Sequence, residues 1–269
     1  MKWVRINHEG QAAYGILNGT TIKLTNQTWA DVLAGMPIEI KAQIAQDGVR
    51  FLNPIGRPGK IVCVGLNYMD HCRETNTPPP KRPLLFTKFT TSMNGPTDDI
   101  VWTTDLTDAV DFEAELGVVI GKTCRRVNEA EALAYVAGYT VANDVSARDV
   151  QLGDGQWIRG KSLDTFCPLG PAFVTVEDIP NPQKLAICSL LNGKIMQDSN
   201  TSEMIFSVAH LIAFCSQAFT LEPGDIILTG TPHGVGLGRD PQVYMQDGDV
   251  IVVEIEGIGR LENRCRIEN

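Results

Sequence analysis

Three acidic residues occupy alternate positions in the segment VDFEAELGVVIG, residues 110–121. If this segment is a strand, as its valines and closing glycine indicate, Asp111, Glu113 and Glu115 project from one face. Carboxylates spaced about 7 Å apart on alternate residues repel one another, and burial strengthens that repulsion unless a positive charge lies among them. A divalent cation would supply this charge.

The alternative interpretation is a solvated edge strand, with apolar side chains facing inward and acidic side chains facing water. Beyond Gly117, however, both faces become apolar, with Val119 on the acidic side and Leu116 and Val118 on the other. A strand that is buried at one end is a poor candidate for a solvated edge. The donors are hard oxygens with no histidine nearby in sequence, which favours Mg2+ or Mn2+ over zinc. Two glutamates are a weak metal signal, so a third ligand is needed.

The best candidate for the third ligand lies in VANDVSARDVQ, residues 141–151. If this segment is also a strand, Asp144 and Arg148 share a face, so an anionic ligand and a fixed cation point into the same space. An ordinary surface ion pair explains the two residues equally well when they are considered alone. Lys161 follows ten residues beyond Gln151, between a glycine and a loop that contains Pro and Gly. Lysines are usually solvated, so Lys161 matters only in the company of the other residues.

A second group that could do chemistry lies in VGLNYMDHCRETN, residues 64–76. With Asn67 as N-cap, this segment is expected to form a short helix in which His71 and Glu74 are neighbours. A histidine beside a carboxylate can move a proton near neutral pH, because the acid orients the ring and stabilises its charged form. A surface helix with a chance pair is the commoner origin of such a spacing. Gly65 before the helix and TPPPKRP after it form one flexible and one stiff joint, which suits a mobile lid.

The elements that must position these residues are mostly short strands. In the N-terminal part, KWVRI, AAYGIL and TIKL alternate or run apolar, and an amphipathic stretch follows around WADVLAGMP. The Pro- and Gly-rich segment NPIGRPGK then predicts a boundary between a small N-terminal domain, residues 1–57, and a larger domain, residues 58–269. The sequence predicts an α+β fold that is mostly β.

Within the larger domain, Asn192-Gly193 between two strand-like runs predicts a β-hairpin. Two helices are also expected. One is NEAEALAYVAG, with Asn128 as N-cap and Gly138 as its C-terminal stop, and the other is SEMIFSVAHLIAFCSQ, apolar along one wide face.

Composition excludes several classes of function. The chain has 269 residues and is 43% hydrophobic, which is enough for a substantial core, and its formal charge is -9 with no basic run, so nucleic acid is an unfavourable partner. The N-terminus MKWVRINHEG lacks the apolar core of a signal peptide, and no 18 consecutive residues are apolar. We therefore expect a cytoplasmic protein without membrane contact. Seven widely spaced cysteines without C-x-x-C argue against a disulfide framework or a zinc ribbon.

From about residue 60 to the C-terminus, the chain resembles the fumarylacetoacetate hydrolase superfamily in its small bacterial two-part form. The resemblance is carried, in order, by VGLNYMDH, LFTKFTTSMNGP, VDFEAELGVVIGK, VAGYTVANDVSARDVQ, GKSLDTFCPLGP, NGKIMQDSNTSEMIFS, LEPGDIILTGTPHGVG and GDVIVVEIEGIGRLENR. The first 57 residues match only the general idea of a small N-terminal domain. The resemblance implies a mixed β-sandwich roll with short helices after a small α+β domain, and a homodimer.

The resemblance also implies roles for particular residues. It implies that Glu113, Glu115 and Asp144 bind Mg2+ or Mn2+, and it assigns no ligand role to Asp111, which we interpret as structural. His71 and Glu74 resemble a dyad that activates water on a lid helix.

By the same resemblance, Lys161 and Gln151 are polar partners of the reacting centre and Arg148 contacts the substrate. Thr231 in the GTP segment closes the pocket with its hydroxyl and backbone. His233 in that loop is interpreted as structural or incidental.

The implied chemistry is coherent for a 2-oxo acid. A metal held by three carboxylates keeps open positions for the carboxylate and keto oxygens of such an acid. Water activated by His71 and Glu74 would attack the distal carbonyl of an acylpyruvate while Lys161 stabilises negative charge, which hydrolyses a carbon-carbon bond as in aromatic catabolism. The same enolate forms when oxaloacetate loses CO2 or when a 2-hydroxydienoate isomerises. The family contains all three activities, so hydrolase, decarboxylase and isomerase or tautomerase remain open, with hydrolysis preferred.

Functions of other classes fit less well. A glycosidase places its two carboxylates across a cleft, whereas Glu113 and Glu115 share a strand face. The segment GTPHGVGLG lacks the third glycine of a dinucleotide-binding loop, with Arg239 in its place. A binding protein that has lost activity is the remaining alternative, but it has no physical need for a set of acids that repel one another.

Overall fold

The computed structural model of the chain describes residues 1–268. Strands form most of its regular structure, and the helices are short, so the expected α+β fold that is mostly β is confirmed. A 12-stranded sheet has the order β4-β3-β2-β1-β14-β12-β11-β17-β6-β7, with β5 beside β1 and β8 beside β14. Its central strands are β14 (Cys167–Thr175), β12 (Val136–Asn143), β11 (Ala114–Ile120), β17 (Ile226–Leu228) and β6 (Ile61–Gly65), and β7 (Leu84–Thr87) lies at the edge beside β6.

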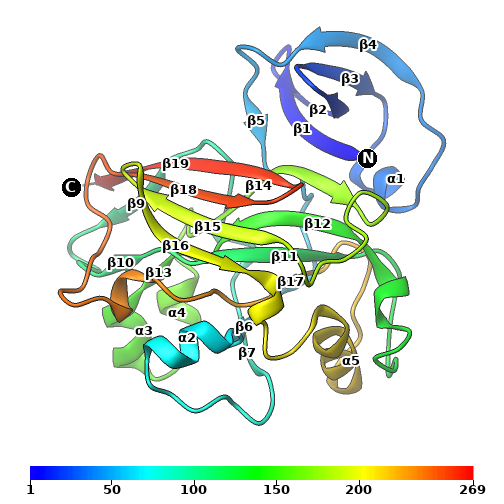
Figure 1. Cartoon of the computed structure of the whole chain (residues 1–269). Coiled ribbons are helices and arrows are strands. Elements are labelled where there is room, and N and C mark those ends of the chain that lie inside the picture. Colours follow the sequence, from blue (N-terminus) through cyan, green and yellow to red (C-terminus); the bar gives the residue numbers. More distant parts are fainter. Residues whose placement is uncertain (269) are drawn as a thin grey trace.

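The N-terminal strands form a lobe of their own, coloured blue in Figure 1. They are β1 (Lys2–His8), β2 (Gln11–Asn18), β3 (Thr21–Thr25), β4 (Ile40–Ala45) and β5 (Phe51–Leu52). Helix α1 (Trp29–Leu33) follows β3, and Thr28 caps it through the Asp31 N–H. The strands and the helix expected from the first 57 residues are therefore present.

The N-terminal lobe is joined to the rest of the chain by strand pairing. Strand β1 runs antiparallel to β14, with Lys2 opposite Val174 and Trp3 opposite Phe173. The large sheet is thus continuous between the two parts of the chain. The domain division at residue 57 stays a prediction.

A 5-stranded sheet packs against the central strands of the large sheet, and its order is β16-β15-β18-β19-β9 (Figure 1). Its strands are β15 (Ala186–Leu191), β16 (Lys194–Asn200), β18 (Val250–Ile255), β19 (Gly259–Glu268) and β9 (Ile100–Thr103). The main core lies between the two sheets, where Leu116 and Val141 belong to the same buried cluster as Ile187, Val253 and Leu261. Burial of this apolar surface is the main driving force for the fold.

The predicted hairpin at Asn192-Gly193 is confirmed. Strands β15 and β16 are antiparallel, and the two turn residues have φ angles of 52° and 79°. Positive φ at both central positions is the geometry that Asn-Gly favours in a two-residue hairpin turn.

The remaining elements are short. The helices are α2 (Met69–Glu74), α3 (Arg148–Asp154), α4 (Ile158–Lys161) and α5 (Val208–Ala218). Single 3-10 turns occur at η1 (Thr90–Ser92), η2 (Ala132–Tyr135), η3 (Thr201–Glu203) and η4 (Gly236–Gly238), and two-residue strands at β8 (Met93–Asn94), β10 (Val110–Asp111) and β13 (Ser146–Ala147). No helix within residues 1–268 has the length and apolar character needed to cross a bilayer.

The helix predicted for residues 128–138 is wrong. Asn128 accepts the Glu131 N–H at 3.1 Å, but only the turn η2 follows, and the chain then enters strand β12. Gly138 is not a helix stop, because it lies inside this strand, where a Cβ would collide with the Val174 carbonyl and the Phe173 ring. Close approach of β14 therefore requires glycine there, and tertiary packing overrides the local helix propensity.

The second predicted helix is shorter than expected. It begins at Val208, with Ser207 as N-cap accepting the His210 N–H, and the preceding residues form η3 and a bend. The apolar face expected from the sequence is buried through Leu211, Ile212 and Cys215.

Candidate active site

The acidic segment is not one continuous strand. Strand β10 ends at Asp111 and β11 begins at Ala114, so the prediction of an unbroken strand over residues 110–121 is wrong. At the break, two buried side chains replace the missing strand partner: Asn143 Oδ1 accepts the Glu113 N–H and Gln197 Oε1 accepts the Ala114 N–H, each at 3.0 Å. These bonds fix the backbone between the two glutamates.

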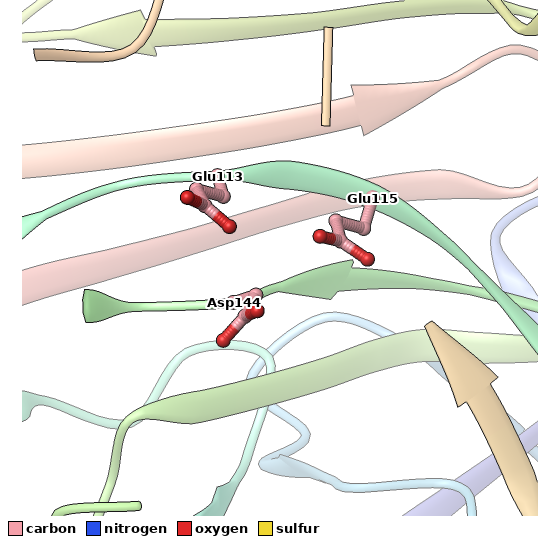
Figure 2. A group of neighbouring side chains, drawn as sticks. All are labelled: Glu113, Glu115 and Asp144. Atoms are coloured by element: carbon pink, nitrogen blue, oxygen red, sulfur yellow. The ribbon is translucent and has the colours of Figure 1, made fainter. Parts of the chain in front are cut away.

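Glu113, Glu115 and Asp144 nevertheless converge. Figure 2 shows their carboxylates turned toward the same space, and one oxygen of each lies within 4.8 Å of the others. All three side chains are buried. Asp144 follows directly after β12, and its N–H donates to the Glu113 carbonyl at 3.0 Å, which brings the two segments together.

The segment around Asp144 differs from the expected strand. Strand β12 ends at Asn143, and after the two-residue strand β13 the chain turns into helix α3, which begins at Arg148. Asp144 and Arg148 therefore do not share a strand face. They meet the same site because the chain turns back there, so that Arg148 approaches Glu113 from the helix.

Three buried cations, Lys161, Lys88 and Arg148, surround the carboxylates. Lys161 Nζ lies 2.8 Å from Glu113 Oε2 and 3.0 Å from Asp144 Oδ2, at the end of helix α4. Lys88 Nζ lies 2.6 Å from the other oxygen of Asp144 and also donates to the Val145 carbonyl at 3.1 Å. The contacts of Lys161 and Lys88 lie in the protein interior, and charge interactions are stronger there than in bulk water.

Lys88 was not identified from the sequence, although it is fully buried in this site. It follows strand β7 in LFTKFTT, and a lysine beside a strand end is normally interpreted as solvated. The only available signal is its position between apolar and aromatic neighbours. The partner that explains its burial, Asp144, is 56 residues away in the chain.

Arg148 uses all of its guanidinium nitrogens on protein groups. Its Nε donates to Asp111 Oδ2 at 2.8 Å, its Nη2 lies 2.6 Å from Glu113 Oε1, and its Nη1 donates to Gln151 Oε1 at 3.0 Å. In this structure Arg148 therefore holds Glu113 in place, and Gln151 holds Arg148. A direct contact of Arg148 or Gln151 with substrate stays a prediction.

Asp111 has a structural explanation. Besides Arg148, its carboxylate accepts the backbone N–H groups of Gly236 at 2.7 Å and Leu237 at 3.0 Å. It is fully buried and ties the loop that follows Thr231 to the site. This agrees with the expectation that Asp111 is structural.

The two glutamates have opposite pKa shifts. Burial alone would raise the pKa of Glu113, but the charges of Lys161 and Arg148 outweigh burial and lower the pKa to about 2. Burial raises the pKa of Glu115 well above its ordinary value, and the charges of Asp144 and Glu113 raise it further. The charge of Lys161 and the Gly230 N–H, which donates to Glu115 Oε2 at 2.8 Å, oppose this shift only in part.

The donor set fits a hard divalent cation. Three carboxylates within 4.8 Å of one another offer only oxygen, which Mg2+ and Mn2+ prefer and which zinc sites seldom use alone. A dication among them would also relieve the repulsion that raises the pKa of Glu115. The three residues predicted as metal ligands are therefore suitably placed to hold one.

His71 and Glu74 form the expected pair on helix α2. Nδ1 of His71 lies 3.0 Å from Glu74 Oε2, and the two side chains are 15% and 18% exposed. The other oxygen of Glu74 accepts the Gly234 N–H at 2.9 Å, from the loop after Thr231. Burial would raise the pKa of Glu74, but the hydrogen bonds from His71 and Gly234 lower it overall.

Asn67 is not the N-cap of this helix. Tyr68 occupies that position without a side-chain capping bond. Asn67 instead accepts the Phe206 N–H at 2.8 Å and donates to the Thr229 carbonyl at 2.7 Å. It therefore fastens the start of the helix to the end of strand β17 rather than capping the helix itself.

A second carboxylate of helix α2 binds the same loop. Asp70 Oδ2 lies 3.0 Å from His233 Nδ1 and accepts a hydrogen bond from Ser199 Oγ on strand β16. With Glu74 on Gly234, this gives the helix two attachments to the loop of residues 229–236. His233, interpreted from the sequence as structural or incidental, has such a structural contact.

Thr231 is placed at the centre of this arrangement. It directly follows Gly230, which binds Glu115, and it is 6% exposed. The Gln197 amide donates to Thr231 Oγ1 at 2.7 Å. The loop that carries Thr231 thus connects the carboxylates with the His71–Glu74 pair.

Buried carboxylates suited to a metal, a buried lysine between them and an adjacent histidine–carboxylate pair together define an enzyme active site. Comparison with known proteins gives the family. Residues 60–266 match the family described as "Fumarylacetoacetate (FAA) hydrolase C-terminal", and residues 1–54 match "Rv2993c-like, N-terminal". The chain belongs to the fumarylacetoacetate hydrolase family, and the resemblance found from the sequence is confirmed.

Individual relatives agree with this assignment. The chain is 52% identical over 218 residues to "Oxaloacetate tautomerase FAHD2A, mitochondrial" of Bos taurus, covering 80% of this chain and 69% of that protein. Among solved structures, a fumarylacetoacetate hydrolase from Exiguobacterium antarcticum superposes with a TM-score of 0.91 at 39% identity, over 100% of both chains. A 2-hydroxyhepta-2,4-diene-1,7-dioate isomerase from Mycobacterium marinum gives 0.86 at 36% identity, over 100% of this chain and 99% of that chain.

Proposed function

We propose that the protein is a divalent-metal-dependent enzyme that interconverts the keto and enol forms of oxaloacetate. The observation that carries the proposal is the buried set of Glu113, Glu115 and Asp144, with Lys161 between two of them. The His71–Glu74 pair on helix α2 is joined to this set by the loop that carries Gly230 and Gly234. The substrate is taken from the bovine relative, whose printed name is that of an oxaloacetate tautomerase. Hydrolysis, preferred from the sequence, becomes the second candidate.

The carboxylate centre would hold the 2-oxo acid end of the substrate. Glu113, Glu115 and Asp144 would hold a divalent cation, which would supply Lewis-acid polarisation of the 2-oxo group and so make the C3 protons more acidic. Lys161 contributes a second positive charge. Burial would lower the pKa of Lys161, but the charges of Asp144 and Glu113 raise it overall, so its ammonium form persists and favours negative charge on the substrate oxygen.

His71 is the group suited to move the proton. Its Nδ1 is held by Glu74, which leaves Nε2 as the nitrogen that exchanges a proton with C3. Glu74 orients the ring, and the hydrogen bonds from His71 and the Gly234 N–H lower the pKa of Glu74, which keeps this carboxylate ionised. Keto–enol exchange needs this proton transfer at C3 and a second one at the 2-oxygen, whose proton exchanges with solvent, and no attacking water.

Hydrolysis of an acylpyruvate remains a second candidate, because the same histidine–carboxylate pair suits the activation of water. Decarboxylation of oxaloacetate and isomerisation of a 2-hydroxydienoate use the same enolate and need no additional residue. The Mycobacterium marinum neighbour, named as an isomerase, supports the last of these.

A substrate panel tests the proposal. The protein would be assayed with enol oxaloacetate, an acylpyruvate, fumarylpyruvate and a 2-hydroxydienoate, with Mg2+, with Mn2+ and in chelator. We expect the fastest turnover with oxaloacetate enol, read from the loss of its ultraviolet absorbance without release of CO2. Faster cleavage of an acylpyruvate would replace tautomerisation by hydrolysis, and equal rates in chelator would contradict metal dependence.

Three further expectations belong with this proposal. Mg2+ is the proposed ion, with Mn2+ as the alternative, because the donor set is all carboxylate. A homodimer and a cytoplasmic location stay predictions, and the name of the bovine relative places that protein in the mitochondrion.

A further inference from the structure

Gln197 lies between the acidic strand and the loop that carries Thr231. It belongs to strand β16 and is fully buried. Its Oε1 accepts the Ala114 N–H at 3.0 Å and the Ser189 hydroxyl at 2.9 Å. Its Nε2 donates to Thr231 Oγ1 at 2.7 Å and to the Pro232 carbonyl at 3.0 Å. One side chain thus joins the residue between Glu113 and Glu115 to two residues of the loop.

The orientation of this amide is fixed by its backbone partners. A backbone N–H can only donate and a backbone carbonyl can only accept, so the oxygen of Gln197 must face Ala114 and its nitrogen must face Pro232. The nitrogen that faces Pro232 is the one that meets Thr231. Thr231 Oγ1 is therefore an acceptor in this contact.

This contact determines where the hydroxyl hydrogen of Thr231 can point. Because a lone pair of Oγ1 faces Gln197, the hydrogen must point elsewhere. The other hydrogen of the Gln197 amide goes to the Pro232 carbonyl. Within residues 1–268 the Thr231 hydroxyl donates to no protein group, while Gly230, its neighbour, binds Glu115.

We propose that Gln197 is a positioning residue that fixes the Thr231 hydroxyl as a hydrogen-bond donor to a carboxylate oxygen of the 2-oxo acid. This inference rests on the proposed function for the identity of the substrate. Gln197 acts through Thr231 and does not touch the substrate. The same amide also accepts the Ala114 N–H, so Gln197 links the Thr231 hydroxyl to the backbone between Glu113 and Glu115.

The test is a double-mutant cycle with Gln197→Met and Thr231→Val, two substitutions that keep side-chain size. Without the amide, no donor occupies the lone pair of Thr231 Oγ1, so the hydroxyl hydrogen can rotate away and its bond to the substrate is weakened. A carboxylate is present in both ground and transition states, so the loss should appear mainly in KM. We expect Gln197→Met and Thr231→Val each to raise KM for oxaloacetate about 10- to 100-fold, with kcat within about 3-fold.

Coupling decides between positioning and general structural damage. If Gln197 acts through Thr231, adding Gln197→Met to Thr231→Val should raise KM by less than about 3-fold more. An additional rise as large as in the wild-type background, or a wild-type KM in Gln197→Met, would overturn the proposal. The same result is expected in the Kd of the Mg2+-loaded protein for oxalate, measured by calorimetry.

Gln183 provides a matched control. Its amide also joins a backbone N–H, that of Val208 at 2.7 Å, to a backbone carbonyl, that of Thr201 at 3.1 Å. Gln183 is half-buried, whereas Gln197 is fully buried. Gln183→Met should therefore lower the melting temperature less than Gln197→Met does, and it should leave KM and the oxalate Kd unchanged. A raised KM in Gln183→Met would mean that loss of stability alone explains the effect.

Two outcomes separate this inference from the proposed function. If the wild type turns over no oxaloacetate but binds oxalate with Mg2+, the proposed reaction fails, and the cycle can still be read from the oxalate Kd.

If Gln197→Met does not fold, Thr231→Ser and Thr231→Val are compared instead. Serine keeps the hydroxyl and its bond from Gln197, so its oxalate Kd should stay within about 3-fold of wild type. Equal weakening in both variants would overturn the proposal.

Discussion

The His71–Glu74 and His210–Glu129 pairs have the same separation, 3.0 Å from Nδ1 to a carboxylate oxygen, in different surroundings. The side chains of the first pair are 15% and 18% exposed, and those of the second are 39% and 55% exposed. In the first pair a backbone group from another element binds the carboxylate, the Gly234 N–H on Glu74, and no such bond reaches Glu129 from residues 1–268. His210 instead stacks on Phe206 at 5.2 Å.

The same contrast applies to the ion pairs with acidic partners. Asp144 is fully buried between Lys88 and Lys161, whereas Asp154 forms an exposed pair with Arg159. An exposed pair gains little because water and salt screen it, while a buried charge that loses its partner is strongly unfavourable. The residue types of an ion pair therefore do not by themselves identify an active site. Burial of the pair and its hydrogen bonds to other strands, helices or loops do.

Substitution of Asp144 should have the largest effect. Asp144→Ala removes one of the three proposed metal ligands and leaves Lys88 and Lys161 without their shared partner. We expect no measurable turnover and a loss of about 3–5 kcal/mol in the free energy of unfolding, measured with urea. Asp154→Ala, at the exposed pair, should change neither quantity measurably. Retained turnover in Asp144→Ala would contradict its role as a metal ligand.

The next largest difference is expected between the turnover rates of the His71→Gln and His210→Gln variants. His71→Gln removes the proposed proton carrier, so turnover should fall about 100- to 10,000-fold, while metal binding is retained. His210→Gln changes the same chemical group on the surface and should leave turnover unchanged. Steady-state rates with oxaloacetate and with an acylpyruvate would be compared for both variants. If His71→Gln loses only acylpyruvate cleavage, the histidine activates water and is dispensable for tautomerisation.

Binding of Mg2+ should stabilise the protein through the buried carboxylates. At 100 times its dissociation constant, an ion that binds only the folded state adds about 2.7 kcal/mol to the free energy of unfolding. We expect a higher melting temperature with Mg2+ or Mn2+ in the wild type and in His71→Gln. Glu115→Gln should show no such rise, because a ligand is lost. An equal rise in Glu115→Gln would place the ion elsewhere, on the exposed acids.

The smallest effect is expected from Glu74 in the acid range. Its pKa is lowered in the folded protein, so it contributes stability above its unfolded pKa and this contribution disappears as pH falls through the lower folded value. Glu74→Gln should therefore destabilise the protein near pH 6 more than near pH 3, measured by urea unfolding. Glu129→Gln is the exposed control. A pH-independent difference between wild type and Glu74→Gln would contradict the bonds from His71 and Gly234.

Local patterns predicted the parts of the fold that depend on local geometry. The Asn192-Gly193 hairpin is correct because positive φ at two adjacent positions is a property of those residues themselves. The helix over 128–138 is wrong because β12 lies in the middle of the large sheet, and long-range pairing there decides the conformation. Gly138 was interpreted as the stop signal of a helix, but a glycine is needed there because a Cβ would collide with β14.

The candidate site was predicted in part. Alternation placed Glu113 and Glu115 together, and the segment VANDVSARDVQ offered Asp144 as the third ligand, in agreement with the family resemblance. The structure brings Asp144 to the two glutamates. The strand expected around Asp144 was wrong, since a chain reversal rather than a shared strand face brings Arg148 to Glu113. Lys88 and Gln197 were missed, because their contacts join residues 56 and 83 positions apart, and no local pattern records such pairs.

The pairing of β1 with β14 has a consequence for any shortened form of the chain. Residues Lys2 and Trp3 occupy hydrogen-bonding positions beside Val174 and Phe173. A fragment that starts after the first lobe would leave Phe173 and Val174 of β14 without these partners, and bare strand edges recruit other chains into aggregates. Pairing with β1 therefore covers this end of β14 against the addition of a strand from another molecule.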